Sequence, residues 1–291
     1  MSYVFTLKIK NICIALQRNV IGLCMLQVSA KKGIKMFGER ALEALAKEYA
    51  QLDSLDVFIP MLVSELTLEQ KRNALNAIDL IAEKRCGRIK GRTVADGRKQ
   101  RPFYSKYETS SPALGLEAII CTLIIDALEG RDVAIADVAG AFLKAEMKEF
   151  VLVKLQGPAV EAILSANRER YARYVSYERG RQVLYVKLRK AMYGTLMAAL
   201  LWYELFAGTI QDLGFSINPY DLCVANKTVA GKQFTICWYV DDLKMFHEDP
   251  AEVTKMIHVL ENKFGKMNVT RGNIHTYLGM NIELKDKKVY I

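Results

Sequence analysis

A pair of adjacent carboxylates between two short apolar runs constrains this chain more than any other feature. Residues 234–239 are apolar and aromatic apart from Thr235, and residues 243–246 resume the apolar run beyond Asp241 and Asp242, with Lys244 expected to point the other way. Such runs favour strands, so the sequence predicts a β-hairpin around the two acids. Tight hairpin turns prefer Asn-Gly or Asp-Gly because those residues tolerate positive φ. Here Val240 and the acids occupy the turn instead.

Two neighbouring carboxylates repel each other, and one pKa rises unless a cation keeps both groups ionised. A divalent metal supplies such a cation, and Mg²⁺ combines a few carboxylates with waters and substrate phosphates. An acidic surface turn is the alternative, and an Asp-Asp dipeptide alone would favour it. The apolar flanks favour a metal-binding hairpin.

Composition places few limits on the fold but more on the partners. The 291 residues are 51% hydrophobic and 25% charged, which is typical of one large globular domain or two small ones. A net charge of +9 and a pI near 9.1 favour a polyanionic partner such as nucleic acid. The six cysteines form no C-x-x-C pair and lie mostly in apolar runs, which indicates reduced core thiols and an intracellular protein.

Residues 1–35 differ from the rest of the chain. Their apolar run is interrupted by Gln17, Arg18 and Asn19, so it predicts neither a membrane span nor a typical secretory signal. We treat the segment as an N-terminal leader: an element packed on the domain, a spurious extension of the reading frame, or, third, a secretory signal. The main domain is expected from residue 36 to 291, with no membrane contact.

Two helices are expected next. Apolar residues recur at three- and four-residue steps from Met36 to about Leu52. Thr67 and Gln70 form a capping-box pattern that predicts the start of a second helix. Its expected apolar stripe consists of Leu68, Leu75, Ile78 and Ile81.

Basic residues then alternate with glycines from Lys84 to Arg101. A charge run of this kind is usually a solvated loop. Glycines at 87, 91 and 97 with Ile89 and Val94 instead favour a basic hairpin that brings cations and backbone N–H groups to phosphates. The stretch by itself leaves both interpretations open.

A third carboxylate closes a buried strand. Residues 114–129 predict a helix that is apolar nearly all round, and residues 133–138 a short apolar strand that contains Asp137. Such an acid faces a site or caps the next element. Gly140 and Ala141 then leave the backbone bare beside Phe142. Further strands are expected at 151–155, 183–188 and 274–284, and helices around 159–174, at 196–213 and from 249 to near 265.

Three ordered motifs carry a resemblance. They are Asp137-Val138-x-x-Ala141-Phe142, then Lys190-Ala191-Met192-Tyr193-Gly194 before a helix with Trp202, then Tyr239-Val240-Asp241-Asp242. In this order they resemble reverse transcriptases of Ty1/copia-type retrotransposons, and the residues 108–112 and 277–279 resemble the same family. Three ordered motifs rarely coincide by chance. The resemblance extends from about residue 36 to 291.

The resemblance implies an α+β right-hand polymerase fold with fingers and palm, in which helices back an antiparallel palm sheet. Asp137, Asp241 and Asp242 would be the catalytic ligands of two Mg²⁺ ions, with Mn²⁺ as a substitute. The implied substrates are dNTPs and an RNA or DNA template with its primer. The implied location is intracellular and cytoplasmic, within a virus-like particle if the element is active, with the nucleus as an alternative.

The same resemblance implies further roles. Phe142 resembles the aromatic steric gate below the sugar of the nucleotide. Tyr193 and Gly194 would lie beside that gate, and the basic stretch around Lys90 and Arg92 resembles the fingers loop that clamps the triphosphate. Residues Tyr277, Leu278 and Gly279 resemble the primer grip.

The chain also departs from the family. The usual run Leu-Lys-Gln-Ala-Pro-Arg after Tyr-Gly is replaced at residues 195–200 by Thr-Leu-Met-Ala-Ala-Leu. The chain stops soon after the primer-grip motif, so we expect a fragment of a Pol polyprotein with most of the thumb missing and integrase, RNase H and protease absent. Two alternatives stay open: a degenerate or domesticated relative that binds nucleic acid without polymerising, and an unrelated metal-dependent phosphotransferase.

Overall fold

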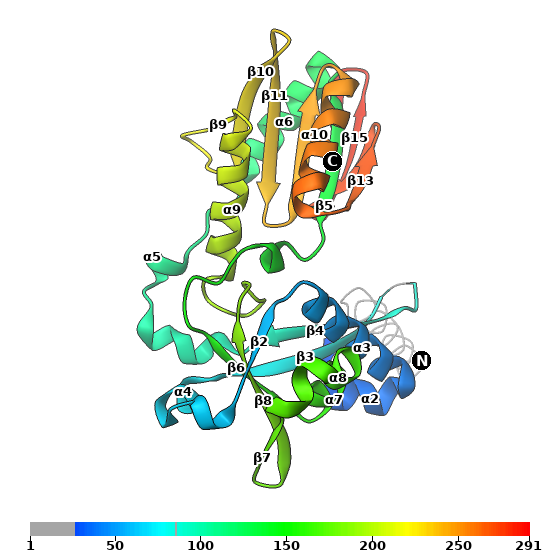
Figure 1. The fold of residues 1–291 in the computed structure, drawn as a ribbon. Helices are drawn as coiled ribbons and strands as arrows, with labels where there is room; N and C mark the ends of the chain where they lie inside the picture. The colour runs from blue at the N-terminus through cyan, green and yellow to red at the C-terminus, as the bar shows by residue number, and fades with distance from the viewer. Residues whose placement is uncertain (1–26, 85) are drawn as a thin grey trace, which may run out of the picture. The chain divides into compact units, whose positions relative to one another are not determined.

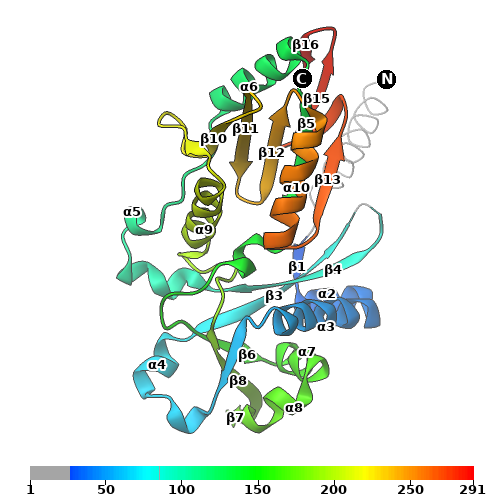
Figure 2. The ribbon, with the colours of Figure 1, turned by 45° about the horizontal axis from the view of Figure 1, so that its top comes forward.

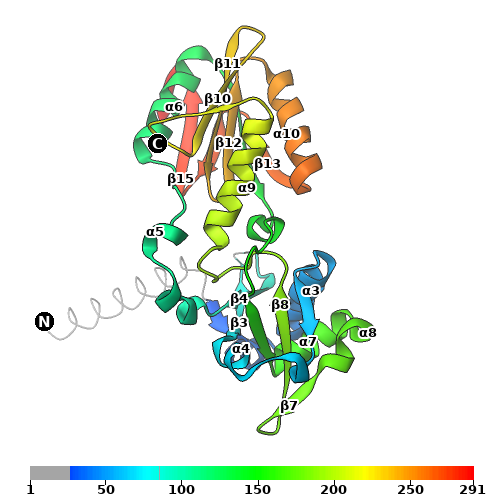
Figure 3. The same ribbon diagram turned by 60° about the vertical axis from the view of Figure 1, so that its left-hand side comes forward.

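A computed structural model describes residues 27–84 and 86–291, so most of the expected leader lies outside the described residues. The chain forms two compact units. Unit 1 comprises Met1–Lys99 and Phe150–Arg189, and unit 2 comprises Gln100–Glu149 and Lys190–Ile291. Figures 1, 2 and 3 show each unit from three directions.

Unit 1 contains a seven-stranded sheet in which β1, β3, β6, β8 and β2 lie in that order, with β4 paired to β3 and β7 to β8. Its strands are β1 (Gln27–Ser29), β2 (Phe58–Met61), β3 (Leu75–Glu83), β4 (Ile89–Ala95), β6 (Leu152–Gln156), β7 (Ser176–Glu178) and β8 (Arg181–Leu188). Its helices are α2 (Ala30–Phe37), α3 (Glu39–Ser54), α4 (Leu68–Asn73), α7 (Pro158–Ala166) and α8 (Arg168–Tyr171). The short 3₁₀ segments are η1 (Val63–Glu65) and η4 (Ala172–Tyr174).

The prediction of a second helix is wrong beyond the first turns of that helix. The capping box of Thr67 and Gln70 is present, but α4 ends at Asn73 and Leu75 begins strand β3. Leu68, expected in the buried stripe, is 81% exposed. A strand forms in place of a longer helix because β3 pairs with β4 along seven residues and also with β1 and β6. These tertiary pairings outweigh a helical spacing of apolar residues.

The basic stretch provides strand β4 of the β3–β4 hairpin, as one of its two interpretations predicts, and its last residues lie in the 3₁₀ segment Gly97–Phe103. Gly91 lies in β4 where that strand passes close to α3: a Cβ at Gly91 would lie 2.7 Å from the carbonyl oxygen of Ala44. The glycine therefore permits close packing of strand on helix.

Unit 2 is built on a six-stranded antiparallel sheet in the order β13-β5-β12-β11-β10-β9, with a separate three-stranded sheet β14-β15-β16. The large sheet consists of β5 (Asp132–Val138), β9 (Ser216–Ile217), β10 (Val224–Val229), β11 (Lys232–Tyr239), β12 (Asp242–His247) and β13 (Met267–Arg271). The small sheet consists of β14 (Ile274–Tyr277), β15 (Met280–Lys285) and β16 (Lys288–Tyr290). The helical segments are η2 (Gly97–Phe103), which begins in unit 1, α5 (Lys106–Thr109), α6 (Leu116–Glu129), η3 (Ala141–Lys144), α9 (Ala198–Asp212) and α10 (Pro250–Phe264).

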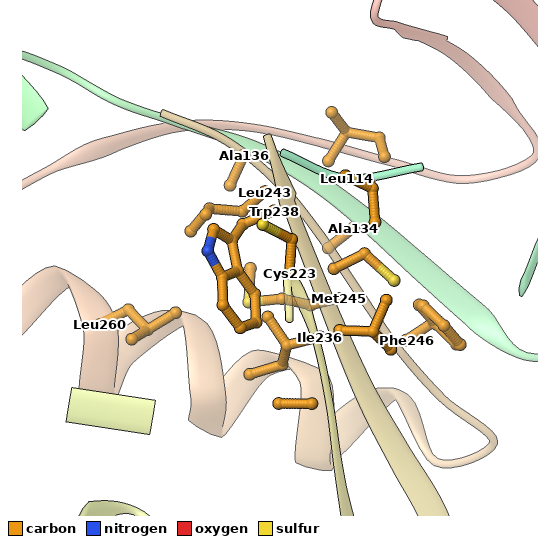
Figure 4. Packing of buried hydrophobic residues seen from close by; sticks show 14 of the residues in the cluster. Leu114, Ala134, Ala136, Cys223, Ile236, Trp238, Leu243, Met245, Phe246 and Leu260 are labelled. Atoms are coloured by element: carbon orange, nitrogen blue, oxygen red, sulfur yellow. The ribbon is translucent and has the colours of Figure 1, made fainter. Parts of the chain in front are cut away.

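Helices cover both faces of the large sheet. Trp238 of β11 contacts Phe206 of α9, which in turn contacts Phe264 of α10, so α9 and α10 share one face (Figure 1). Helix α6 lies on the opposite face, where its Thr122 contacts Lys244 of β12 (Figure 3). Figure 4 shows the core between these layers, with Trp238, Leu243 and Met245 at its centre.

Helix α6 is less enclosed than the sequence predicts. Its residues Leu116, Ile120, Ile124 and Leu128 recur every fourth position and are exposed, whereas Ile119, Leu123 and Ala127 are buried. Cys86 and Cys121 are exposed free thiols and Cys223 and Cys237 are buried free thiols, so the expectation of core cysteines holds for two of these four. The other two cysteines lie outside the described residues.

Within residues 27–84 and 86–291, no helix combines the length and apolar character that crossing a membrane requires.

Candidate active site

The predicted hairpin is present, and its turn is strained. Tyr239 of β11 pairs with Asp242 of β12, which leaves Val240 and Asp241 as the turn. Val240 has φ +57°, a left-handed conformation that is rare for a β-branched residue. Backbone strain of this kind persists only where the surroundings hold it in place.

Two hydrogen bonds hold this turn. The indole Nε1 of Trp202 donates to the carbonyl oxygen of Val240 at 2.7 Å, and the amide of Val138 donates to the carbonyl oxygen of Asp241 at 3.0 Å. Trp202 belongs to α9 and is almost fully buried. The hydrogen bond from Trp202 to the turn was not predicted, because a tryptophan in an apolar helix usually indicates a core residue.

The sheet places the carboxylates side by side. Asp242 of β12 lies directly opposite Asp137 of β5, and Asp137 lies opposite Asn268 of β13 on its other side. The Nδ2 of Asn268 is 3.5 Å from Oδ2 of Asp137. The 3.5 Å spacing makes this a weak contact at most. Asn268 is therefore a neighbour of the carboxylate pair that could not be predicted, since nothing in its local sequence marks it.

The electrostatics of Asp137, Asp241 and Asp242 favour a bound cation. Burial raises the pKa of Asp242, and the charges of Asp241 and Asp137 raise it further. All three carboxylates are partly buried. A divalent cation would offset the repulsion that these shifts express.

The donor set fits a hard metal ion in part. Among the described residues, no three His, Cys, Asp or Glu side chains are gathered closely enough to form a metal cluster by themselves. Magnesium, however, is usually bound by one or two carboxylates, with waters and substrate phosphates completing its octahedron. Asp137 and Asp242 provide that number of carboxylates on neighbouring strands.

The two aromatic residues assigned to the nucleotide pocket are in contact. The rings of Phe142 and Tyr193 have centroids 4.7 Å apart and are tilted by 52°. Phe142 lies on η3 and is partly buried, as is Tyr193. The amide of Ala191 donates to the carbonyl oxygen of Ala145 at 2.8 Å, which holds the two segments together. Gly194 follows with φ +89° and is exposed, so glycine suits this position.

The predicted primer-grip residues form a second strained turn. Tyr277 of β14 pairs with Met280 of β15, and Leu278 and Gly279 between them have φ +48° and +84°. The ring of Tyr277 is buried, and its hydroxyl has no hydrogen-bond partner among the described residues. Of these three residues, Leu278 is half-buried and Gly279 is exposed.

The two predicted fingers cations lie in unit 1. Lys90 and Arg92 are exposed on the same face of β4, and together with Lys84 they line one small cavity. In the residues that follow β4, Arg98 pairs with Asp96, and Nζ of Lys99 donates to the carbonyl oxygens of Arg72 and Ala74.

Comparison with known proteins identifies the family. The family model for "Reverse transcriptase (RNA-dependent DNA polymerase)" matches residues 77–291, about three quarters of the chain. The chain belongs to the reverse transcriptase family. It is 27% identical over 196 residues to the retrovirus-related Pol polyprotein from transposon RE1 of Arabidopsis thaliana. That match covers 66% of this chain and 12% of the relative, so the chain spans a small part of the Pol polyprotein.

Among solved structures, the reverse transcriptase chain is similar to telomerase from Candida albicans in complex with a fragment of telomeric RNA. The similarity covers 86% of this chain and 50% of that chain, with 10% identity and a TM-score of 0.46.

The predicted resemblance to Ty1/copia-type reverse transcriptases is confirmed, and so is the α+β fold with a helix-backed antiparallel sheet. The boundary at residue 36 stays a prediction. It falls within α2, and the family match starts at residue 77.

Proposed function

We propose that this chain is an RNA-directed DNA polymerase domain of a copia-type Pol polyprotein. The observation that carries the proposal is the register of the large sheet, which sets Asp242 opposite Asp137 with Asp241 in the adjoining turn. Enzymes of this family act on nucleic-acid templates, and the net charge of +9 suits a polyanionic substrate.

In the proposed reaction the primer 3′-oxygen attacks the α-phosphorus of a dNTP. The bond from the α-phosphorus to the bridging oxygen breaks, pyrophosphate leaves, and the hydroxyl proton passes to solvent. Asp137, Asp241 and Asp242 would hold two Mg²⁺ ions, or Mn²⁺ in their place. When bound, these ions lower the pKa of the 3′-hydroxyl and stabilise the charge on the leaving group.

The nucleotide would lie against the aromatic pair. Phe142 and Tyr193 are in contact, and the bare backbone at Gly194 leaves room for a base or template strand beside them. Phe142 would exclude a 2′-hydroxyl by steric clash. The family resemblance assigns the neutralisation of phosphate charge to Lys90 and Arg92 of unit 1, whose exposed side chains lie on one face of β4.

The primer would contact the β14–β15 turn. Because Tyr277 is buried, its role would be to anchor the hairpin, while the backbone at Leu278 and Gly279 would face the nucleic acid. In the complete polyprotein, integrase and RNase H would act on the same nucleic acid, in the cytoplasm, in a virus-like particle or in the nucleus.

Primer extension tests the proposal. The purified chain should incorporate dNTPs on a primed RNA template in the presence of Mg²⁺, and Asp137→Asn or Asp241→Asn should remove nearly all activity because ligand charge is lost while size is kept. Asp212→Asn, at an exposed residue that ends α9, is the matched control and should stay active. Equal extension by the parent and both site variants would refute the assignment.

The run after Gly194 supports a second candidate, a relative that binds nucleic acid without polymerising. Residues 195–200 lack the lysine, glutamine and arginine of the family, and Leu196, Met197 and Leu200 are partly exposed apolar side chains there. Salt-sensitive binding of a primer–template without any extension would favour this candidate.

A further inference from the structure

An ion pair lies in the interior of unit 2. Nζ of Lys244 on β12 is 2.5 Å from Oδ2 of Asp126 on α6, and both side chains are 0% exposed. The same ammonium donates to Oγ1 of Thr122 at 3.0 Å and lies 3.9 Å from the ring centroid of Phe246. Among the ion pairs of the described residues, this pair alone has both partners fully buried.

Stability does not explain a pair at this position. The desolvation of two charges often exceeds their mutual attraction, so an apolar pair of similar volume is frequently as stable or more stable. Burial raises the pKa of Asp126 even though Lys244 opposes the shift, which shows that desolvation dominates. A buried polar group can instead specify one arrangement among several.

The arrangement that needs specifying is the strand register. Strands β5 and β12 are buried on both faces, and their buried residues are apolar apart from Lys244 and, at the end of β12, His247. Register is normally fixed because a one-residue slip moves apolar side chains from the core to the solvent. Where both faces are core, that penalty is small. The interior residues are Val133, Ala134, Ile135, Ala136, Leu243, Met245 and Phe246.

Lys244 makes a register slip of β12 unfavourable. A one-residue slip of β12 would turn its ammonium toward the α9 and α10 face, where Trp238 and Phe206 pack. A two-residue slip would keep the face but shift Lys244 along the strand by roughly 7 Å, away from Asp126. Helix α6 leads through Gly130 directly into β5, so Asp126 is fixed close to the strand that carries Asp137.

We propose that the Lys244–Asp126 pair is a register lock that sets Asp242 opposite Asp137 and thereby positions the carboxylates for metal ions. Both are positioning residues, because neither contacts a reacting group. The metal part rests on the proposed function, whereas the register part rests on the sheet alone.

The test removes both charges together. Lys244→Met with Asp126→Leu leaves no unpaired buried charge, so this double variant should fold with a melting temperature equal to or above that of the parent. Amide hydrogen exchange in residues 132–138 and 242–247 should nevertheless become faster. The affinity for Mn²⁺, measured by electron paramagnetic resonance of the free ion, should fall about tenfold or more, as for other residues that orient metal ligands.

The matched control removes an exposed pair of the same chemistry. Lys148 and Glu204 are 2.7 Å apart with side chains 70% and 46% exposed. Lys148→Met with Glu204→Leu should change neither the exchange of the two strands nor the Mn²⁺ affinity.

Each outcome decides a separate point. Unchanged exchange and unchanged Mn²⁺ affinity in the Lys244/Asp126 double variant would overturn the lock and leave the proposed function intact. Failure of that variant to fold would also overturn it, because the pair would then serve stability. Faster exchange in a chain whose parent binds no Mn²⁺ would support the register lock and refute the proposed metal site.

Discussion

Replacing Phe142 by valine should change which sugar the site accepts. If the ring lies under the sugar of the incoming nucleotide, Phe142→Val opens space for a 2′-hydroxyl and raises ribonucleotide incorporation relative to deoxyribonucleotide. Sites that discriminate by shape alone typically gain or lose about 10–200-fold for one small group. We expect the ratio of kcat/KM for dNTP to kcat/KM for rNTP to decrease by a factor of about 10–200.

The contacts of Phe142 also set the effect on stability. The ring contacts that of Tyr193 in a tilted arrangement with centroids 4.7 Å apart, and such an aromatic pair contributes about 0.5–1.5 kcal/mol beyond burial. Complete truncation of a fully buried phenylalanine costs about 3–5 kcal/mol. Phe142 is only partly buried and valine keeps part of its volume, so the loss should be about 1–2 kcal/mol.

A control separates the gate from general damage. Leu143 is the next residue of η3 and is buried in the core, so Leu143→Ala should lower both activities together and leave their ratio unchanged. The reasoning is refuted if Phe142→Val is folded and active by thermal melting and primer extension yet keeps the parental preference for dNTPs.

Two further predictions concern the turn and the basic hairpin. Trp202→Phe removes the indole donor to the carbonyl of Val240, which should cost about 1–3 kcal/mol of stability in thermal melts. It should also lower kcat even where the variant is fully folded. An unchanged kcat would show that the turn keeps its shape without this hydrogen bond. Replacing Lys90 and Arg92 by serine should make the slope of the logarithm of the primer–template binding constant against the logarithm of salt concentration shallower by about 1–2. The reason is that each lost phosphate contact removes about one unit of slope. An unchanged slope would indicate a solvated hairpin without phosphate contacts.

The turn at the carboxylates was predictable from the sequence because its residues differ from those that tight hairpin turns prefer. A β-branched valine is a poor turn residue, and the structure gives Val240 a left-handed φ of +57°. The capping box at Thr67 was likewise predictable, since its two hydrogen bonds join residues three apart in the chain. Local signals of this kind need no knowledge of distant partners.

Features set by distant pairing were not predictable in the same way. Strand β3 has a helix-like spacing of apolar residues and becomes a strand because three other strands pair with it. Asn268 and Trp202 acquire their places near the carboxylates through β13 and α9, about 131 and 38 residues away from their partners in sequence. No single sequence window contains both partners of such contacts.

The titration of Asp242 links the carboxylates to metal binding. Because its pKa lies above the ordinary value of 3.8, the folded chain holds this proton more tightly than the unfolded chain. The associated stability is present below that ordinary pKa and is lost as pH rises through the folded pKa. Metal competes with the same proton, so metal affinity should increase as pH rises through this window.

The most direct test of the carboxylate site is the number of Mn²⁺ ions bound in the presence of a non-hydrolysable dNTP, counted by electron paramagnetic resonance. The account predicts two ions on the parent chain, with affinity that rises with pH above 3.8. In Asp137→Asn and Asp242→Asn, one or both ions should be lost. Binding of equal stoichiometry and affinity by the parent and both variants would contradict the account.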